Sequence, residues 1–275
     1  MLFQLHLQLF PSIINIFISN IKNKQLNKSI VFNSEYINFK EDILNIIENF
    51  NTTNGFTIKE HRNNIKKFNL GKIQINVKSF RIPHFFNSIV YAFFRSSKAN
   101  RSYNYAIKLI DLGVNTPSPI CYCEVKNNFL LKTSFYISEQ IDFDFQISEV
   151  INNRNFPNRI NILNAFVRFT LNLHENGINF LDHSQGNTLV KLDNNKPIFY
   201  LVDLNRMRFE KMNFKMRIMN FRRLTNDKEV INIISSEYAK LSNRSKEEVF
   251  KLMMYYSNQF LSRRSIRKKI KKFFS

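Results

Sequence analysis

The chain has 275 residues, of which 44% are hydrophobic, so it is long enough for one large domain or two small lobes with a soluble core. Lys and Arg number 41 against 21 Asp and Glu, which gives a formal charge of +20. Such an excess favours polyanionic partners, which include nucleic acid, phospholipid head groups and phosphorylated glycolipids. The two cysteines, Cys121 and Cys123, are too few and too close together for a disulfide framework or a four-ligand zinc site, and we expect free thiols in a reducing cytosol.

Residues 1–28 form an apolar stretch that has no charged side chain before Lys22. The stretch lacks the basic start and the small-residue cleavage site of a signal peptide, and its polar residues dilute it too much for a membrane span. We expect a disordered N-terminal extension, with an interfacial helix as the alternative.

Residues 29–141 show the pattern of a small β-sheet lobe with one main helix. Apolar residues alternate in Ile73, Ile75 and Val77, as in a half-buried strand. The predicted elements are a strand and a helix within 29–50, two strands at 56–68 and 72–80 joined by a turn at Gly71, a helix over about 97–112 closed by Gly113, and strands leading to 125 and 141.

Residues 142–275 read as a larger and mostly helical lobe. The acidic segment 142–146 is the best candidate for the boundary, and a helix over 158–176 is predicted to end at Gly177 with a left-handed cap. Residues 188–204 predict a β-hairpin, and the chain after Asp203 is predicted to be helical, with a capping box of Ser245 and Glu248 and a basic tail. The sequence therefore predicts an α+β fold of two lobes.

The segment "FLDHSQGNTLV" places an acid and an amide five residues apart, just before a strand. Folding of the predicted hairpin would bring Asp182, Asn187 and Asp203 to one edge. Phosphoryl transfer requires such a set, because one carboxylate orients the attacking hydroxyl while an amide and a second carboxylate hold Mg²⁺. The alternative interpretations are an Asx turn at Asp182 and Asn187 and a strand-end cap at Asp203.

Lys78 ends the alternating strand of the predicted N-terminal sheet, where a lysine can contact the α- and β-phosphates of a nucleotide. A solvated edge lysine is the alternative. His174 and His183 have no second ligand at a recognisable interval, so we expect core or loop histidines and not a metal site.

These motifs resemble the lipopolysaccharide kinase family, the Kdo/heptose kinases with a protein-kinase-like fold. The resemblance rests on "FLDHSQGNTLV", "FYLVDLNRMRF", "HRNNIKKF", "VKSFRIPHFFNSIVYAFFRSSKANRSY" and "LGVNTPSPICYCE", and it extends from residue 30 to residue 225. It implies a two-lobed kinase-like fold with a nucleotide-binding lobe at 29–141 and a catalytic lobe at 142–275.

The resemblance also implies the chemistry of the site. Lys78 would contact ATP, Asp182 would be the catalytic base, and Asn187 and Asp203 would bind Mg²⁺. The acceptor would be a sugar hydroxyl, Kdo first and heptose second, of the lipopolysaccharide inner core or a lipid A precursor. The enzyme would be cytoplasmic and peripheral at the inner face of the bacterial inner membrane, and the basic tail at 263–272 suits an anionic membrane surface.

Two alternative functions follow, one from a departure from the kinase pattern and one from the charge of the chain. The candidate helix offers Asn104 where a kinase would place an acidic partner for Lys78, which favours a pseudokinase scaffold as the rival function. Arg206 and Arg208 are candidates for binding an anionic acceptor, although exposed arginines often only face solvent. A basic nucleic-acid-binding protein ranks third, because no nucleic-acid-binding motif accompanies the charge.

Overall fold

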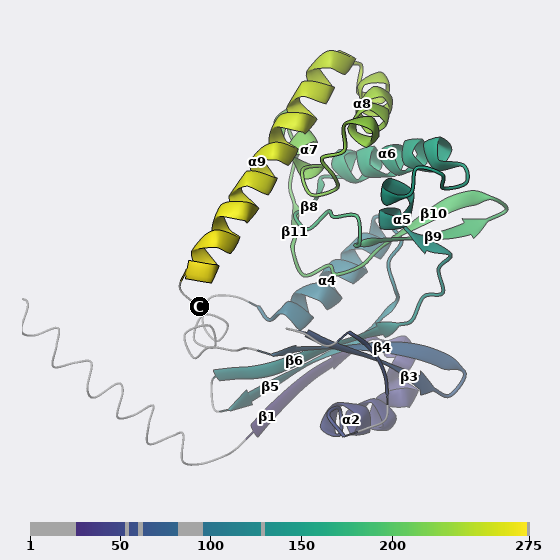
Figure 1. The fold of residues 1–275 in the computed structure, drawn as a ribbon. Coiled ribbons are helices and arrows are strands. Elements are labelled where there is room, and N and C mark those ends of the chain that lie inside the picture. Colours follow the sequence, from purple (N-terminus) through teal and green to yellow (C-terminus); the bar gives the residue numbers. More distant parts are fainter. Residues whose placement is uncertain (1–25, 53–54, 60–62, 82–95, 128–129, 274–275) are drawn as a thin grey trace, which may run out of the picture. The chain divides into compact units, whose positions relative to one another are not determined.

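The computed structural model describes residues 26–52, 55–59, 63–81, 96–127 and 130–273. The chain folds into two compact units, which we call the sheet unit (residues 1–104 and 118–140) and the helical unit (residues 105–117 and 141–275). Figure 1 shows strands predominating in the first unit and helices in the second. Of the predicted N-terminal extension at 1–28, residues 1–25 lie outside the described residues. Residues 26–28 belong to the first strand, Leu26–Phe32.

The sheet unit is built on one antiparallel six-stranded sheet with the order β1-β5-β6-β4-β3-β2. The strands are β1 (Leu26–Phe32), β2 (Phe56–Lys59), β3 (Asn63–Leu70), β4 (Ile73–Arg81), β5 (Pro119–Asn127) and β6 (Leu130–Glu139), with the 3-10 helix η1 (Ser34–Phe39) and the helix α2 (Lys40–Glu48) after β1. The alternating side chains of Ile75 and Val77 lie in the core, as their period of two predicts. Cys121 and Cys123 are free, as predicted, and are buried in the same core.

One strand prediction in this unit is wrong. Residues 56–68 form two strands, β2 and β3, which pair antiparallel with Phe56 opposite Lys67. The polar run between them has no alternation of apolar residues, so periodicity gives no sign of the reversal.

Helix α4 (Lys98–Asp111) is divided between the units, because residues up to 104 belong to the sheet unit and the following turns to the helical unit. Ala106 and Leu109 pack in a helical-unit cluster that includes Phe180 and Leu201. The helix ends near the predicted residue, and Gly113 adopts the left-handed conformation with φ of 72°.

The helical unit contains the helices α5 (Ile147–Asn152), α6 (Arg159–Glu175), α7 (Phe214–Asn220), α8 (Lys228–Ser242) and α9 (Lys246–Phe273). It also contains two small sheets. The first is formed by β7 (Phe145–Gln146), β9 (Thr188–Asp193) and β10 (Lys196–Leu201), and the second by β8 (Ile178–Phe180) and β11 (Met207–Phe209). The predicted hairpin is confirmed as β9 and β10, with Thr188 opposite Leu201. The prediction that only helix follows Asp203 is wrong, because β11 pairs with β8 before α7 begins.

The predicted left-handed cap of α6 is confirmed at Gly177, where φ is 68°. A Cβ at this position would lie 2.9 Å from the carbonyl oxygen of Glu210, whose N–H donates to the Gly177 carbonyl at 2.8 Å. The glycine is therefore required both by the backbone conformation and by the close approach of the Glu210 backbone, which directly follows β11.

We predict that Gly177→Ala lowers the free energy of unfolding by about 2 kcal/mol or more, because the substitution adds a steric clash to left-handed strain. Chemical denaturation of purified protein would measure the change. Gly113→Ala is the matched control, since Gly113 is also left-handed but a Cβ there meets nothing within 4 Å. Equal losses in the two variants would contradict the role of the Glu210 contact.

Candidate active site

The loop that carries Asp182 leaves β8 in a conformation fixed by backbone hydrogen bonds. The Leu181 N–H donates to the Arg206 carbonyl at 3.0 Å, and the His183 N–H donates to the Phe180 carbonyl at 3.1 Å. Asp182 lies between these two anchored residues, and its side chain is only 15% exposed. The strand end therefore holds the carboxylate at a defined and partly sheltered position.

Asn187 joins this loop to the β9–β10 hairpin. Its Nδ2 donates to the Asp182 carbonyl oxygen at 2.8 Å, and its own carbonyl accepts the Val202 N–H at 3.1 Å. Val202 directly precedes Asp203, so one side-chain and one backbone hydrogen bond link Asp182, Asn187 and the turn that carries Asp203. Within the described part of the chain, no group donates a hydrogen bond to Oδ1 of Asn187, which leaves this oxygen able to bind a cation.

Asp203 follows β10 in the left-handed conformation, with φ of 59°. This region is uncommon for a residue with a Cβ, although aspartate tolerates it better than most. The Asn205 amide donates to Oδ1 of Asp203 at 2.7 Å, and Asn205 is itself buried. Backbone strain of this kind is concentrated at functional sites, so it marks Asp203 as a residue with a specified orientation.

The donor atoms of Asn187 and Asp203 fit the coordination chemistry of Mg²⁺. This hard cation prefers oxygen ligands and is commonly held by one or two protein side chains together with phosphate oxygens and water. The amide oxygen of Asn187 and the carboxylate of Asp203 supply such ligands at the end of the hairpin. Across the described residues there is no cluster of three or more His, Cys, Asp and Glu side chains, so the fit rests on this pair.

Two arginines contact the carboxylate of Asp182. Nη2 of Arg223 lies 2.7 Å from Oδ1, in an ion pair without the geometry of a directed hydrogen bond, and Nη1 of Arg206 lies 3.7 Å from Oδ2. Arg223 is 27% exposed and Arg206 is 50% exposed, so the first contact is the more sheltered. Oppositely charged guanidinium groups on both oxygens restrict the rotation of the carboxylate.

The remaining predicted residues lie on three other elements, β4, β11 and α4. Lys78 is on β4 of the sheet unit, with Nζ 5.2 Å from the ring centroid of Phe80. Arg208 is exposed on β11, and its side chain forms no ion pair with Asp182. Asn104 lies on α4, where its Nδ2 donates to the carbonyl and to Oδ1 of Asn100, both at 3.0 Å.

Asn220, at the C-terminal end of α7, fixes the start of the Asp182 loop through side-chain hydrogen bonds to β8. Its Nδ2 donates to Oδ1 of Asn179 at 3.1 Å and to the Phe180 carbonyl at 2.9 Å. Its Oδ1 lies 2.9 Å from Nδ1 of His183 and 3.3 Å from Nε2 of His174. One amide that is 3% exposed thus ties a strand end and two histidines together.

The same network assigns the histidine tautomers. Because Nδ2 of Asn220 is a donor, its Oδ1 must accept, so His183 carries its proton on Nδ1 and His174 on Nε2. Nδ1 of His174 then accepts from the Tyr238 hydroxyl at 3.0 Å. Burial lowers the pKa of His174 to about 3 and that of His183 to about 4, which keeps both rings neutral and confirms the prediction of core histidines.

Sequence reasoning missed Arg223 and Asn220. Both come from the segment between β11 and α8, about forty residues after the loop that they contact, and neither stands in a motif with a recognisable interval. The pair "RR" at 222–223 was the one available signal, and it cannot be distinguished from the many other basic residues of this chain.

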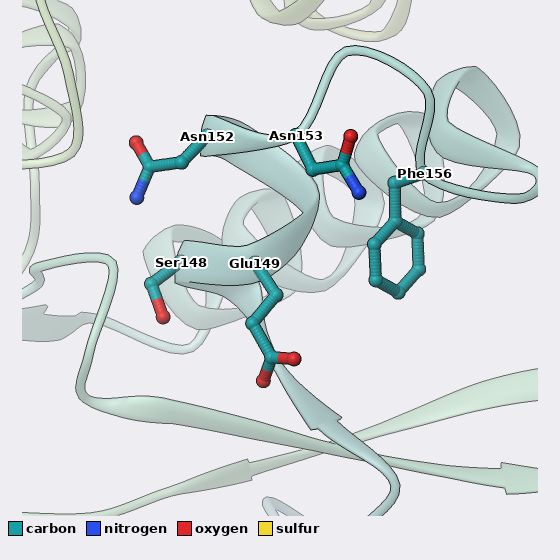
Figure 2. A pocket seen from close by; sticks show the side chains of 5 residues that line it. All are labelled: Ser148, Glu149, Asn152, Asn153 and Phe156. Carbon is teal, nitrogen blue, oxygen red and sulfur yellow. The ribbon is translucent and has the colours of Figure 1, made fainter.

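A surface pocket elsewhere in the helical unit is lined by residues on and after α5 (Figure 2). Its lining residues are Ser148, Glu149, Asn152, Asn153 and Phe156. The Glu149 carboxylate already accepts the Gln146 N–H at 2.8 Å as part of a helix cap. None of the predicted site residues lines this pocket, and it is not part of the candidate active site.

Comparison with known proteins identifies the family and the fold of the chain. The model of the lipopolysaccharide kinase (Kdo/WaaP) family matches residues 63–256. Among solved structures, WaaP in complex with acyl carrier protein aligns with a TM-score of 0.58 at 15% identity, covering 84% of this chain and 97% of that chain. A search of curated protein sequences gave no match.

Two further solved structures align with lower TM-scores. The Rio2 kinase of Chaetomium thermophilum, in a complex with ADP/Mg²⁺-phosphoaspartate, has a TM-score of 0.45 at 13% identity, covering 80% of this chain and 67% of that chain. WbdD, in a co-crystal with a kinase inhibitor, has a TM-score of 0.42 at 14% identity, covering 73% of this chain and 44% of that chain.

The fold is a kinase-like α+β fold, as predicted, with a β-sheet N-terminal part and a helical C-terminal part, and the protein is a phosphotransferase. The chain belongs to the lipopolysaccharide kinase (Kdo/WaaP) family, whose model matches well over half of its length. Among the described helices, none is both long and apolar enough to cross a membrane.

We predict that stability falls as the pH drops below about 6.5, because the unfolded chain protonates His174 and His183 there while the folded protein keeps them neutral down to about pH 4. Between pH 7.5 and pH 5.5 the two histidines together should lower the free energy of unfolding by about 3 kcal/mol. Urea denaturation at several pH values would measure the change, and His183→Asn should remove about half of it. A flat profile over this range would contradict the neutral pair.

Proposed function

We propose that this protein transfers the γ-phosphate of ATP to a sugar hydroxyl, of Kdo or of heptose, in the lipopolysaccharide inner core. The observation that supports the proposal is the connection of Asp182, Asn187 and the Asp203 turn at one end of the β9–β10 hairpin. Phosphoryl transfer depends on positioning and electrostatic stabilisation, for which such a rigid set of oxygen ligands is suited. Residues 29–141 would form the nucleotide-binding lobe and residues 142–275 the catalytic lobe.

In this proposal Asp182 is the catalytic base. Its carboxylate would orient the acceptor hydroxyl and take its proton as the hydroxyl oxygen bonds to the γ-phosphorus and the bond to the bridging β-phosphate oxygen breaks. The ion pairs with Arg223 and Arg206 hold the carboxylate in place for this step. A base whose orientation is fixed before the acceptor arrives lowers the entropic cost of reaching the transition state.

Asn187 and Asp203 would hold Mg²⁺ through the amide oxygen and the carboxylate. When bound, the ion neutralises charge on the β- and γ-phosphates. The Asn187 amide is oriented for this role by its bond to the Asp182 carbonyl, and the Asp203 carboxylate by its bond from Asn205. The base and the cation ligands are thus held by the same short loop and turn.

Lys78 would contact the α- and β-phosphates from β4 of the nucleotide-binding lobe. The pseudokinase alternative rests on Asn104, whose amide bonds to Asn100 and offers no negative charge to a lysine. Membership of a kinase family favours turnover, and the acceptor assay below separates the two.

Arg206 and Arg208 would contribute to acceptor binding. Arg206 supports this role best, since its guanidinium lies beside Asp182 and is half exposed, so it is able to contact a ligand that approaches the base. Arg208 lies two residues further along the chain on β11 and faces solvent.

The last turns of α9 support a peripheral location at the anionic inner face of the inner membrane. The helix continues to Phe273, and residues 261–270 are exposed throughout. Ile266, Ile270 and Phe273 follow the spacing i, i+4, i+7 and so share one face, while the segment 263–272 holds seven Lys and Arg and no Asp or Glu. An apolar stripe flanked by cations is typical of a helix that lies on an anionic lipid surface.

We predict that Asp182→Asn lowers the kcat for phosphorylation of Kdo-lipid A, or of a heptosylated core acceptor, by about a hundredfold or more, because the base is lost. Mg·ATP binding should remain in this variant and be lost in Asp203→Ala. Transfer of labelled γ-phosphate and a nucleotide titration would measure the two effects.

Asp193→Ala is the control for both variants, since Asp193 ends β9 of the same hairpin and is exposed at the turn, at the opposite end from the site. Wild-type protein that binds Mg·ATP and labels neither acceptor would favour the pseudokinase. Binding to random DNA with a steep salt dependence, together with indifference to Mg·ATP, would instead favour the nucleic-acid alternative.

We predict that Ile266→Ser weakens binding to vesicles containing phosphatidylglycerol by about threefold to tenfold, because the variant loses apolar burial in the lipid interface. Co-sedimentation would measure the change. Ile160→Ser on α6 is the matched control, since the two isoleucines are 56% and 59% exposed. Equal binding by wild type and the α9 variant would contradict a membrane role for this helix.

A further inference from the structure

Four arginines from three separate segments lie close enough to interact electrostatically with Asp182 or with one another. Arg206 lies between β10 and β11, Arg222 and Arg223 follow α7, and Arg263 lies on α9. Two of them contact Asp182 directly, with nitrogen–oxygen distances of 2.7 Å for Arg223 and 3.7 Å for Arg206.

Arg223 is held in place by contacts on two sides. Its guanidinium carbon lies 5.1 Å from the ring centroid of Phe260 on α9, while Nη2 contacts Asp182. Its backbone forms an isolated parallel bridge with Ser184 of the Asp182 loop. The residue therefore connects α9 to the loop, and its side chain is too constrained to be an ordinary solvated arginine.

Arg222 and Arg263 complete the group. Nη1 of Arg222 donates to the Met219 carbonyl at 2.9 Å, which holds the side chain close to α7. Arg263 lies one helical turn after Phe260 and so projects from nearly the same side of α9 as the ring that packs on Arg223.

The positive charge of this group is not balanced locally. Burial is the first cause of a lowered pKa of the Arg222 guanidinium. The charges of Arg223, Arg206 and Arg263 lower it further, and the carboxylate of Asp182 acts in the opposite direction. Within the described residues, Asp182 is the one carboxylate in an ion pair with any of the four arginines, so three positive charges remain without a partner of opposite sign.

We propose that Arg206, Arg222, Arg223 and Arg263 form a subsite that binds an anionic group of the acceptor beside Asp182. The proposal deepens the proposed function and rests on it for the identity of the acceptor. Planar guanidinium groups present several donors in a fixed fork, which matches the oxygens of a carboxylate or a phosphate ester. Among sugar acceptors, Kdo carries a carboxylate and heptose is neutral, so the subsite favours an acceptor that contains the acidic sugar or a sugar phosphate.

Binding of soluble probes without nucleotide tests the subsite directly. We expect calorimetric titration to show binding of a deacylated, phosphate-free Kdo oligosaccharide or of a phosphorylated glucosamine disaccharide. The carboxyl-reduced Kdo oligosaccharide separates the two sources, because it should lose binding if the carboxylate is the ligand. The absence of acyl chains removes any contribution of the membrane-binding end of α9.

Arg206→Gln and Arg263→Gln should each weaken binding of the favoured probe by about tenfold, as expected for loss of one charge-assisted contact. Lys269→Gln is the matched control, since it removes one charge from an exposed position on the same helix, and it should change the affinity less than twofold. In the transfer assay the two arginine variants should raise KM for the anionic acceptor and leave Mg·ATP affinity unchanged.

Failure of the subsite and failure of the proposed function give different results. No binding of either anionic probe, or an equal loss in Lys269→Gln, would overturn the subsite even if the wild type phosphorylates an acceptor. Probe binding that is lost selectively in the arginine variants would support the subsite even if no γ-phosphate were transferred.

Discussion

The buried side chain of Asn220 is the contact on which the geometry of the site depends. Its amide nitrogen satisfies the Asn179 side chain and the Phe180 carbonyl at the end of β8, and its oxygen accepts from two neutral histidines. A buried amide in this position has no water to replace a lost partner, so the network is stable only when every member is in place. Asp182 is only two residues after Phe180, so the position of its carboxylate depends on the packing of α7, which carries Asn220, and of α6, which carries His174.

The neutrality of the two histidines is part of the same constraint. Both lie among aromatic rings, His183 against Phe166 and Phe180 and His174 against Phe221. A charged imidazole at either position would have no carboxylate partner, and it would be repelled by the arginines near Asp182. Burial suppresses that charge, so the positive potential around Asp182 comes from arginines, which cannot lose their protons in the physiological range.

The parts of this structure that could be predicted from the sequence are those determined by neighbouring residues. The β9–β10 hairpin follows from alternation around a turn, and Gly177 and Gly113 follow from helix ends that require a left-handed residue. The reversal between β2 and β3 was missed because its polar residues lack a period, and β11 was missed because it is only three residues long. Arg223 and Asn220 reach the Asp182 loop from a distant segment, and only tertiary packing of α7 and α9 determines that approach.

Helix α9 connects the two anion-binding surfaces proposed for this enzyme. Phe260 and Arg263 lie at the arginine group, and the apolar stripe ends at Phe273, so about ten residues separate them, or ~15 Å along a straight helix. With the last turns of α9 on the lipid surface, this short distance along the helix would keep the arginines and Asp182 close to the head groups. That position suits an acceptor sugar that lies near the membrane anchor of a glycolipid. The same helix would therefore contribute both to membrane binding and, through Arg263, to binding of the anionic acceptor.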